Sequence, residues 1–131
     1  MTEASDVEIY ITGVKGPALV EWLSSELDLL EPMPRQPGMM KNASCYKGTY
    51  KGESFTVMVL EKVIGSFTSL WIDSNQSPWP DDRSCARAAS AYFQKEVRIA
   101  AGAWQEKDDP DAWISVAPDG SENAIQWQTP S

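Results

Sequence analysis

Residues 44–73 read "SCYKGTYKGESFTVMVLEKVIGSFTSLWID" and contain three strand-like segments separated by short turns. The first turn is Lys51-Gly52, whose glycine suits the left-handed backbone of a tight hairpin. The second turn is Ile64-Gly65, which leads into a further strand over residues 66–73. The continuous apolar run at 57–60 predicts an interior strand covered on both faces. Consecutive strands joined by tight turns therefore predict an antiparallel sheet in the middle of the chain.

A strand and then a helix are predicted before this sheet. Residues 7–14, "VEIYITGV", alternate apolar and polar side chains, which is the pattern of a half-buried strand. Gly13 and Gly16 interrupt that pattern, and Pro17 suits the first turn of a helix. Apolar residues then recur at helical spacing to about residue 31. Three prolines at 32, 34 and 37 are expected to end the helix and to begin an irregular connector.

The stretch after the sheet, "SPWPDDRSCARAASAYF" at 77–93, predicts a second helix. Asp81 or Asp82 is expected to be its N-cap, because a carboxylate can accept the free N–H groups of the first turn. One apolar stripe then runs from Cys85 to Phe93 at helical spacing. This stripe favours Cys85 as a small core residue. The alternative is a reactive thiol, since a helix N-terminus lowers a thiol's pKa.

The end of the chain predicts further strands. Residues 112–117 and 123–127 flank Pro118-Asp119-Gly120, a strong turn signal, and are expected to form a closing hairpin. Residues 95–101 fit either a continuation of the second helix or a short strand. The predicted order is strand, helix, strand, strand, strand, helix, strand, strand. We therefore expect one α+β domain over residues 1–131, with a mainly antiparallel sheet covered by two helices.

This order divides into two strand-helix-strand-strand halves, a duplication of pattern with a period of about 60 residues. It is similar to the element order of the tandem strand-helix-strand-strand modules in the effector-binding domains of bacterial multidrug-responsive regulators. What this resemblance implies is a ligand cleft between the two halves.

Composition narrows the functional classes. The 131-residue chain has a net charge of −8 and no histidine. Without histidine, Ser-His-Asp catalysis, Cys-His catalysis and histidine-ligated zinc are excluded. An acidic chain also lacks the usual driving force for binding nucleic acid or anionic membranes.

The expected location of the chain bears on the state of its cysteines. No apolar run approaches the length that spans a bilayer, and the first residues do not resemble a signal peptide. A cytoplasmic, reducing location is therefore expected, with Cys45 and Cys85 as free thiols. In an exported chain the two could pair.

Tryptophans beside acidic residues are the candidate functional feature. Trp79 lies between two prolines, and Trp104 begins the acidic segment 104–113. These rings could anchor a partner or ligand, or they could cover one end of the sheet. Likewise, the acidic residues of segment 104–113 could be a recognition patch or a solvated turn. The candidate patch comprises Trp79, Trp104, Glu106, Asp108, Asp109 and Asp111, with Asp73, Asp81 and Asp82 as secondary members.

No metal site or cofactor is predicted, because only Asp109 and Asp111 match the spacing of a calcium loop. The favoured hypothesis is a non-catalytic, acidic protein-binding module, such as an inhibitor or immunity-type antagonist of a basic partner protein. The second hypothesis is a domain that binds an aromatic or cationic small molecule in a tryptophan and carboxylate cleft between the two halves. The third is an enzyme that uses Asp, Glu or Cys85. It is less favoured because no base partner is evident, and no residue is assigned as catalytic.

Overall fold

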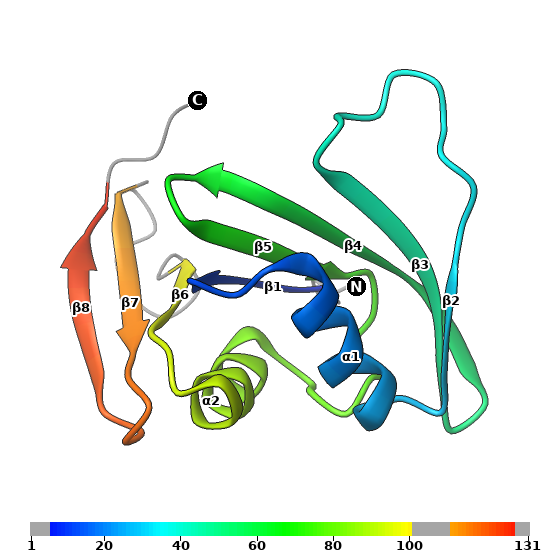
Figure 1. Cartoon of the computed structure of the whole chain (residues 1–131). Coiled ribbons are helices and arrows are strands. Elements are labelled where there is room, and N and C mark those ends of the chain that lie inside the picture. Colours follow the sequence, from blue (N-terminus) through cyan, green and yellow to red (C-terminus); the bar gives the residue numbers. More distant parts are fainter. Residues whose placement is uncertain (1–5, 101–110, 128–131) are drawn as a thin grey trace, which may run out of the picture.

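The computed structural model of the protein describes residues 6–100 and 111–127. In this part the chain forms a sheet of eight antiparallel strands and two helices (Figure 1). The elements are β1 (Val7–Thr12), α1 (Gly16–Glu26), β2 (Leu29–Pro32), β3 (Ala43–Tyr50), β4 (Glu53–Ile64), β5 (Phe67–Ile72), α2 (Asp82–Phe93), β6 (Val97–Ala100), β7 (Ala112–Val116) and β8 (Glu122–Gln126). The strand order across the sheet is β2-β3-β4-β5-β1-β6-β7-β8. The predicted α+β class and the order of the predicted elements are confirmed.

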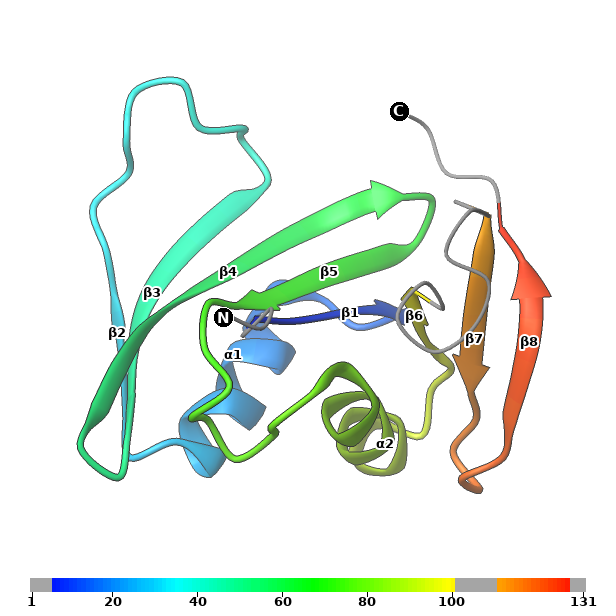
Figure 2. The same ribbon diagram turned by 180° about the vertical axis from the view of Figure 1, so that it is seen from behind.

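Both helices lie on the same side of the twisted sheet, between its two edges (Figures 1 and 2). The alternation in β1 explains this placement. Val7, Ile9 and Ile11 are fully buried beneath the helices, together with side chains of β4, β5 and β6. Burying one such aliphatic side chain contributes about 1.5–3 kcal/mol. The side chains between them in β1 point to the opposite face, which no described helix covers.

The predicted hairpin turn between β3 and β4 is confirmed. Lys51 and Gly52 both have positive φ, 48° and 86°, as a two-residue turn of the I′ type requires. The strand after this turn differs from the prediction for 57–60. Val57 and Val59 are buried beneath the helices, whereas Met58 and Leu60 are only half-buried on the other face. The apolar run is therefore fully covered on one face, because both helices pack on the same side of the sheet.

Two strands occur where the sequence predicted none or left the choice open. The first helix ends at Glu26 rather than near residue 31, and the segment Leu29–Pro32 instead pairs with β3 as an edge strand. An edge position tolerates Pro32, which has no N–H to donate to a neighbour. Residues 97–100 form β6 between β1 and β7, because α2 stops at Phe93 and Gln94 takes a left-handed conformation with φ of 57°.

The start of α2 follows the sequence prediction. The Asp81 carboxylate accepts hydrogen bonds from the Ser84 backbone N–H at 2.8 Å and from its hydroxyl at 2.7 Å, so Asp81 is the N-cap. Cys85 has 0% exposure in the first turn, and this burial raises the pKa of its thiol. Cys85 is therefore a core residue, and both Cys45 and Cys85 are free thiols.

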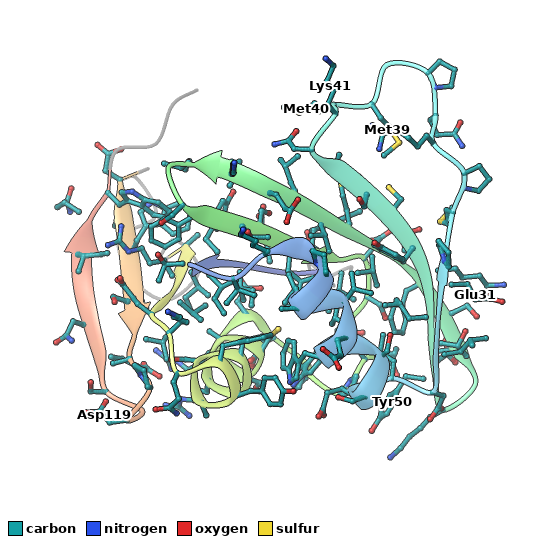
Figure 3. All side chains as sticks on the ribbon, in the orientation of Figure 1. Glu31, Met39, Met40, Lys41, Tyr50 and Asp119 are labelled. Carbon is teal, nitrogen blue, oxygen red and sulfur yellow. The ribbon has the colours of Figure 1, made fainter. Side chains whose placement is uncertain are left out.

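The closing hairpin is also confirmed. Figure 3 shows Asp119 at the turn between β7 and β8, where its carboxylate accepts a hydrogen bond from the Ser121 backbone N–H at 2.8 Å. Gly120 supplies the left-handed residue of this turn, with φ of 91°.

The two halves have the same order of elements along the chain, but their corresponding strands take different positions in the sheet. After α1 the chain runs to the edge at β2 and returns inward through β3 and β4 to β5. After α2 it enters the centre at β6 and runs outward to β8. The halves meet where β1 pairs with β5 over six consecutive residue pairs, from Val7–Ile72 to Thr12–Phe67. A continuous ladder of hydrogen bonds therefore joins the halves within the sheet.

Candidate functional site

Trp79 lies inside the molecule. Its side chain is 5% exposed and stacks on Trp22 of α1, with ring centroids 4.8 Å apart and an angle of 27° between the planes. Trp22 also meets Phe93 of α2 edge-on at 5.6 Å. These rings fill the space between the two helices. Trp79 therefore covers the core, as in the packing alternative, and does not offer an exposed ring to a partner.

The rest of the main predicted patch is only partly visible. Trp104, Glu106, Asp108 and Asp109 lie outside the described residues. Asp111 lies just before β7 and is half-buried. Its backbone carbonyl accepts a hydrogen bond from the backbone N–H of Trp127 at 2.9 Å.

Of the secondary members, Asp81 and Asp82 lie close to Asp6 and Glu8. These four residues form an acidic cluster where β1 begins and α2 starts. Asp82 accepts a hydrogen bond from the Glu8 backbone N–H at 2.9 Å. Burial raises the pKa of Asp82 to about 6, and the charges of Asp6, Glu8 and Asp81 act in the same direction. Burial likewise raises the pKa of Glu8. Asp73 is exposed just beyond the end of β5.

A second group of aromatic residues lies on the sheet face opposite the helices. We call Tyr10, Phe67, Trp113 and Trp127 the open-face aromatic cluster. Tyr10 meets the rings of Trp113 and Trp127 edge-on at 5.3 and 5.7 Å, and the two indoles are 4.8 Å apart. Phe67 lies 4.8 Å from Trp127. Such edge-on pairs contribute about 0.5–1.5 kcal/mol beyond the area they bury.

Arg98 of β6 packs on this cluster. Its guanidinium lies 4.6 Å from the centroid of Trp127 and 4.8 Å from that of Phe67, within the range of a cation–π contact. Its Nε donates a hydrogen bond to Glu96 at 2.8 Å. Burial raises the pKa of Glu96, but hydrogen bonds from Arg98 and Ser115 outweigh this effect and leave the pKa below its usual value.

Carboxylates border the cluster on the same face. The Tyr10 hydroxyl donates a hydrogen bond to Glu8 at 3.2 Å, and the Trp71 indole N–H donates to Asp6 at 2.8 Å. Glu8 and Trp71 are direct neighbours across β1 and β5. Burial raises the pKa of Tyr10 to about 12, and the negative charge of Glu8 adds to the effect. We call the cluster together with Asp6, Glu8 and Trp71 the acidic–aromatic face.

Trp113 of β7 is buried on this face. Its side chain is 8% exposed, and its indole N–H has no hydrogen-bond acceptor in the described part of the chain. A buried donor without an acceptor costs about 1–3 kcal/mol.

Sequence reasoning missed this face because it looked for exposed loop tryptophans. The signal was present in part, since Tyr10 alternates with the buried residues of β1 and must point to the opposite face. Trp113 and Trp127 stood in the predicted closing hairpin. Nothing local indicated that β6 and β7 would bring this hairpin beside β1.

The described residues show neither a metal site nor a membrane-spanning helix. No group of three or more Cys, Asp or Glu side chains within residues 6–100 and 111–127 is arranged to hold a metal ion. In the same ranges no helix has the length and apolar character needed to cross a bilayer. Comparisons of the chain with protein-family models, with curated proteins and with solved structures give no significant match.

Proposed function

We propose that this chain is a non-catalytic protein-binding module whose acidic–aromatic face binds a partner with a basic surface. The observation that carries the proposal is that Asp6 and Glu8 are hydrogen-bonded to Trp71 and Tyr10 on the face that no described helix covers. An inhibitor or immunity-type antagonist of a basic protein is the kind of module that this arrangement suits.

Electrostatics favours such a partner. The net charge of −8 steers basic proteins toward the chain and repels acidic ones. The charge of Asp6 raises the pKa values of both Glu8 and Asp82, so like charges crowd at this end of the sheet. A lysine or arginine of the partner would relieve that repulsion. Binding is then expected to strengthen as the pH rises through about 6, where Asp82 becomes charged.

The aromatic side chains supply the second part of the recognition. Tyrosine, tryptophan and arginine are enriched at the energetic centres of protein interfaces. The hydrogen bonds at Tyr10 and Trp71 hold these side chains in place before binding, so less conformational entropy is lost on association. The Arg98 guanidinium already lies over the rings of Phe67 and Trp127. A cation of the partner would therefore bind at the part of the face around Tyr10 and Trp71.

A capture experiment tests the proposal. The full chain is immobilised and challenged with extract of the native cell, and bound protein is released by raising the salt concentration. The double variant Asp6→Asn with Glu8→Gln should no longer capture this protein. The matched control, Glu21→Gln with Glu53→Gln, removes the same charge from exposed positions on α1 and at the β3–β4 turn. Equal capture by both variants, or no stoichiometric protein released by salt, would argue against the proposal.

The small-molecule hypothesis gains less support. It requires a cleft between the two halves, whereas the helices of the two halves are packed together through Trp22, Trp79 and Phe93.

A further inference from the structure

A separate hollow lies where the chain passes from β1 into α1. Its volume is about 460 Å³, within the range of small-molecule sites. The hollow is lined by the β1–α1 loop, the end of β4, the β4–β5 turn and the start of β5, including Val14, Lys15, Glu61, Lys62, Ser66 and Thr68. None of these residues belongs to the acidic–aromatic face.

The walls of this hollow are fixed by hydrogen bonds between segments far apart in the sequence. The Gly13 N–H donates to the Ser66 carbonyl at 3.1 Å, and the buried Thr68 hydroxyl donates to the Val14 carbonyl at 2.7 Å. The Glu61 carboxylate accepts a hydrogen bond from the Gly16 N–H at the start of α1. The hollow is therefore preformed rather than a gap between loosely attached loops.

Two lysines line the hollow, in a chain with 19 acids and 11 bases. Lys15 precedes α1, and Lys62 lies in the irregular part of β4 where the pairing with β5 shifts between Leu60 and Ile64. Lys62 has a φ of 53°, a conformation that non-glycine residues rarely adopt. The ammonium group of Lys95 lies close by, 3.6 Å from where a Cβ on Gly13 would sit.

The one acid that lines the hollow is engaged by the start of α1. Glu61 accepts the hydrogen bond from Gly16 and lies at the positive end of the α1 dipole. Its carboxylate is therefore held at the helix start. Within residues 6–100 and 111–127, neither Lys15 nor Lys62 forms an ion pair. Val14 and Thr68 also line the hollow, and both residues are buried.

We propose that this hollow binds a small organic monocarboxylate with an apolar body. The ammonium groups of Lys15 and Lys62 pair with the ligand's carboxylate, and its hydrocarbon part contacts Val14 and Thr68. The fixed negative charge of Glu61 disfavours ligands with more than one negative charge. This site is independent of the proposed protein partner, so either proposal can fail without the other.

The test is a titration of the full chain with hexanoate, followed by backbone amide chemical shifts. Hexylamine and inorganic phosphate serve as comparison ligands, because one reverses the charge and the other lacks the apolar body. Hexanoate is expected to shift the signals of Gly13, Gly65 and Ser66 in a saturable way, and neither comparison ligand should do so.

Variants separate a lysine site from a general effect. Lys62→Gly removes one ammonium and suits the left-handed backbone, and Lys15→Met removes the other. Each should weaken hexanoate binding about threefold, as expected for a solvent-exposed ion pair. The matched control is Lys51→Gly, which changes the other lysine of positive φ, at the distant β3–β4 turn. The proposal is overturned if hexylamine or phosphate binds as well as hexanoate, if hexanoate shifts no signal of the hollow, or if Lys51→Gly weakens binding as much as Lys62→Gly.

Discussion

Replacing Asp82 by asparagine should stabilise the protein near neutral pH. The folded state raises the pKa of Asp82 from 3.8 to about 6, chiefly through burial. A carboxyl group with a raised pKa holds its proton more tightly in the folded state than in the unfolded state. The free energy of unfolding therefore falls as the pH rises from about 4 to about 6, because the folded state must accept an unfavourable charge. Asparagine avoids this charge and can still accept the hydrogen bond from the Glu8 N–H.

The magnitude follows from the same shift. A change from 3.8 to about 6 would correspond to about 3 kcal/mol if it were fully expressed. Asp82 is only half-buried, so solvent screens part of the effect. A carboxylate in the first turn of α2 also gains about 0.3–1 kcal/mol from the helix dipole, which asparagine loses. We therefore expect a net gain of about 1 kcal/mol for Asp82→Asn at about pH 8, which raises the melting temperature by about 3–4 °C.

Thermal unfolding followed by circular dichroism between about pH 4 and about pH 8 is the assay. The difference between Asp82→Asn and wild type should grow across this range and vanish at its acidic end. Asp73→Asn is the matched control, since it removes the same charge from an exposed position beyond β5. A variant that is less stable than wild type at the alkaline end, or a difference that does not change with pH, would refute the reasoning.

Three further outcomes follow from packing. Trp79→Ala should lower the free energy of unfolding by about 3–5 kcal/mol, because it empties the space between the helices. Urea denaturation measures this change, and a loss below about 1 kcal/mol would show that the ring is not part of the core. Gly48→Ala should cost about 1–3 kcal/mol in the same assay, because its Cβ would lie 2.7 Å from the Phe55 ring; an unchanged midpoint would contradict that contact. In thiol labelling of the native protein, Cys45 should react while Cys85 stays protected until unfolding, and equal rates would place Cys85 outside the core.

Local signals in the sequence carried much of the fold. The Lys51-Gly52 turn and the cap of α2 depend on the conformations of a few adjacent residues. The sequence was therefore enough to locate the turn and to narrow the cap to Asp81 or Asp82. The end of α1 was not predictable in this way. Leu30 continues the helical spacing, but pairing with β3 draws residues 29–32 into the sheet instead. That pairing partner lies beyond the proline-rich connector, and no local pattern points to it.

The candidate site was harder to predict than the fold for the same reason. Tyr10, Phe67, Trp113 and Trp127 come from four separate segments, and they meet only because β6 and β7 follow β1 in the sheet. Likewise, the prolines beside Trp79 left open whether its ring anchors a partner or covers the sheet, and the structure packs that ring against Trp22. Composition indicated an acidic and aromatic protein, whereas long-range strand pairing decides which of those side chains share a face.

The most direct test of the acidic–aromatic face is the indole N–H signal of Trp71, which reports on its hydrogen bond to Asp6. The full chain is titrated with an arginine- and lysine-rich peptide, and an acidic peptide of equal length is the comparison. We expect the basic peptide to shift the Trp71 signal in a saturable way, while the buried indoles of Trp22 and Trp79 stay in place. A Trp71 signal that does not move, or that moves equally with the acidic peptide, would contradict recognition of a basic partner by this face.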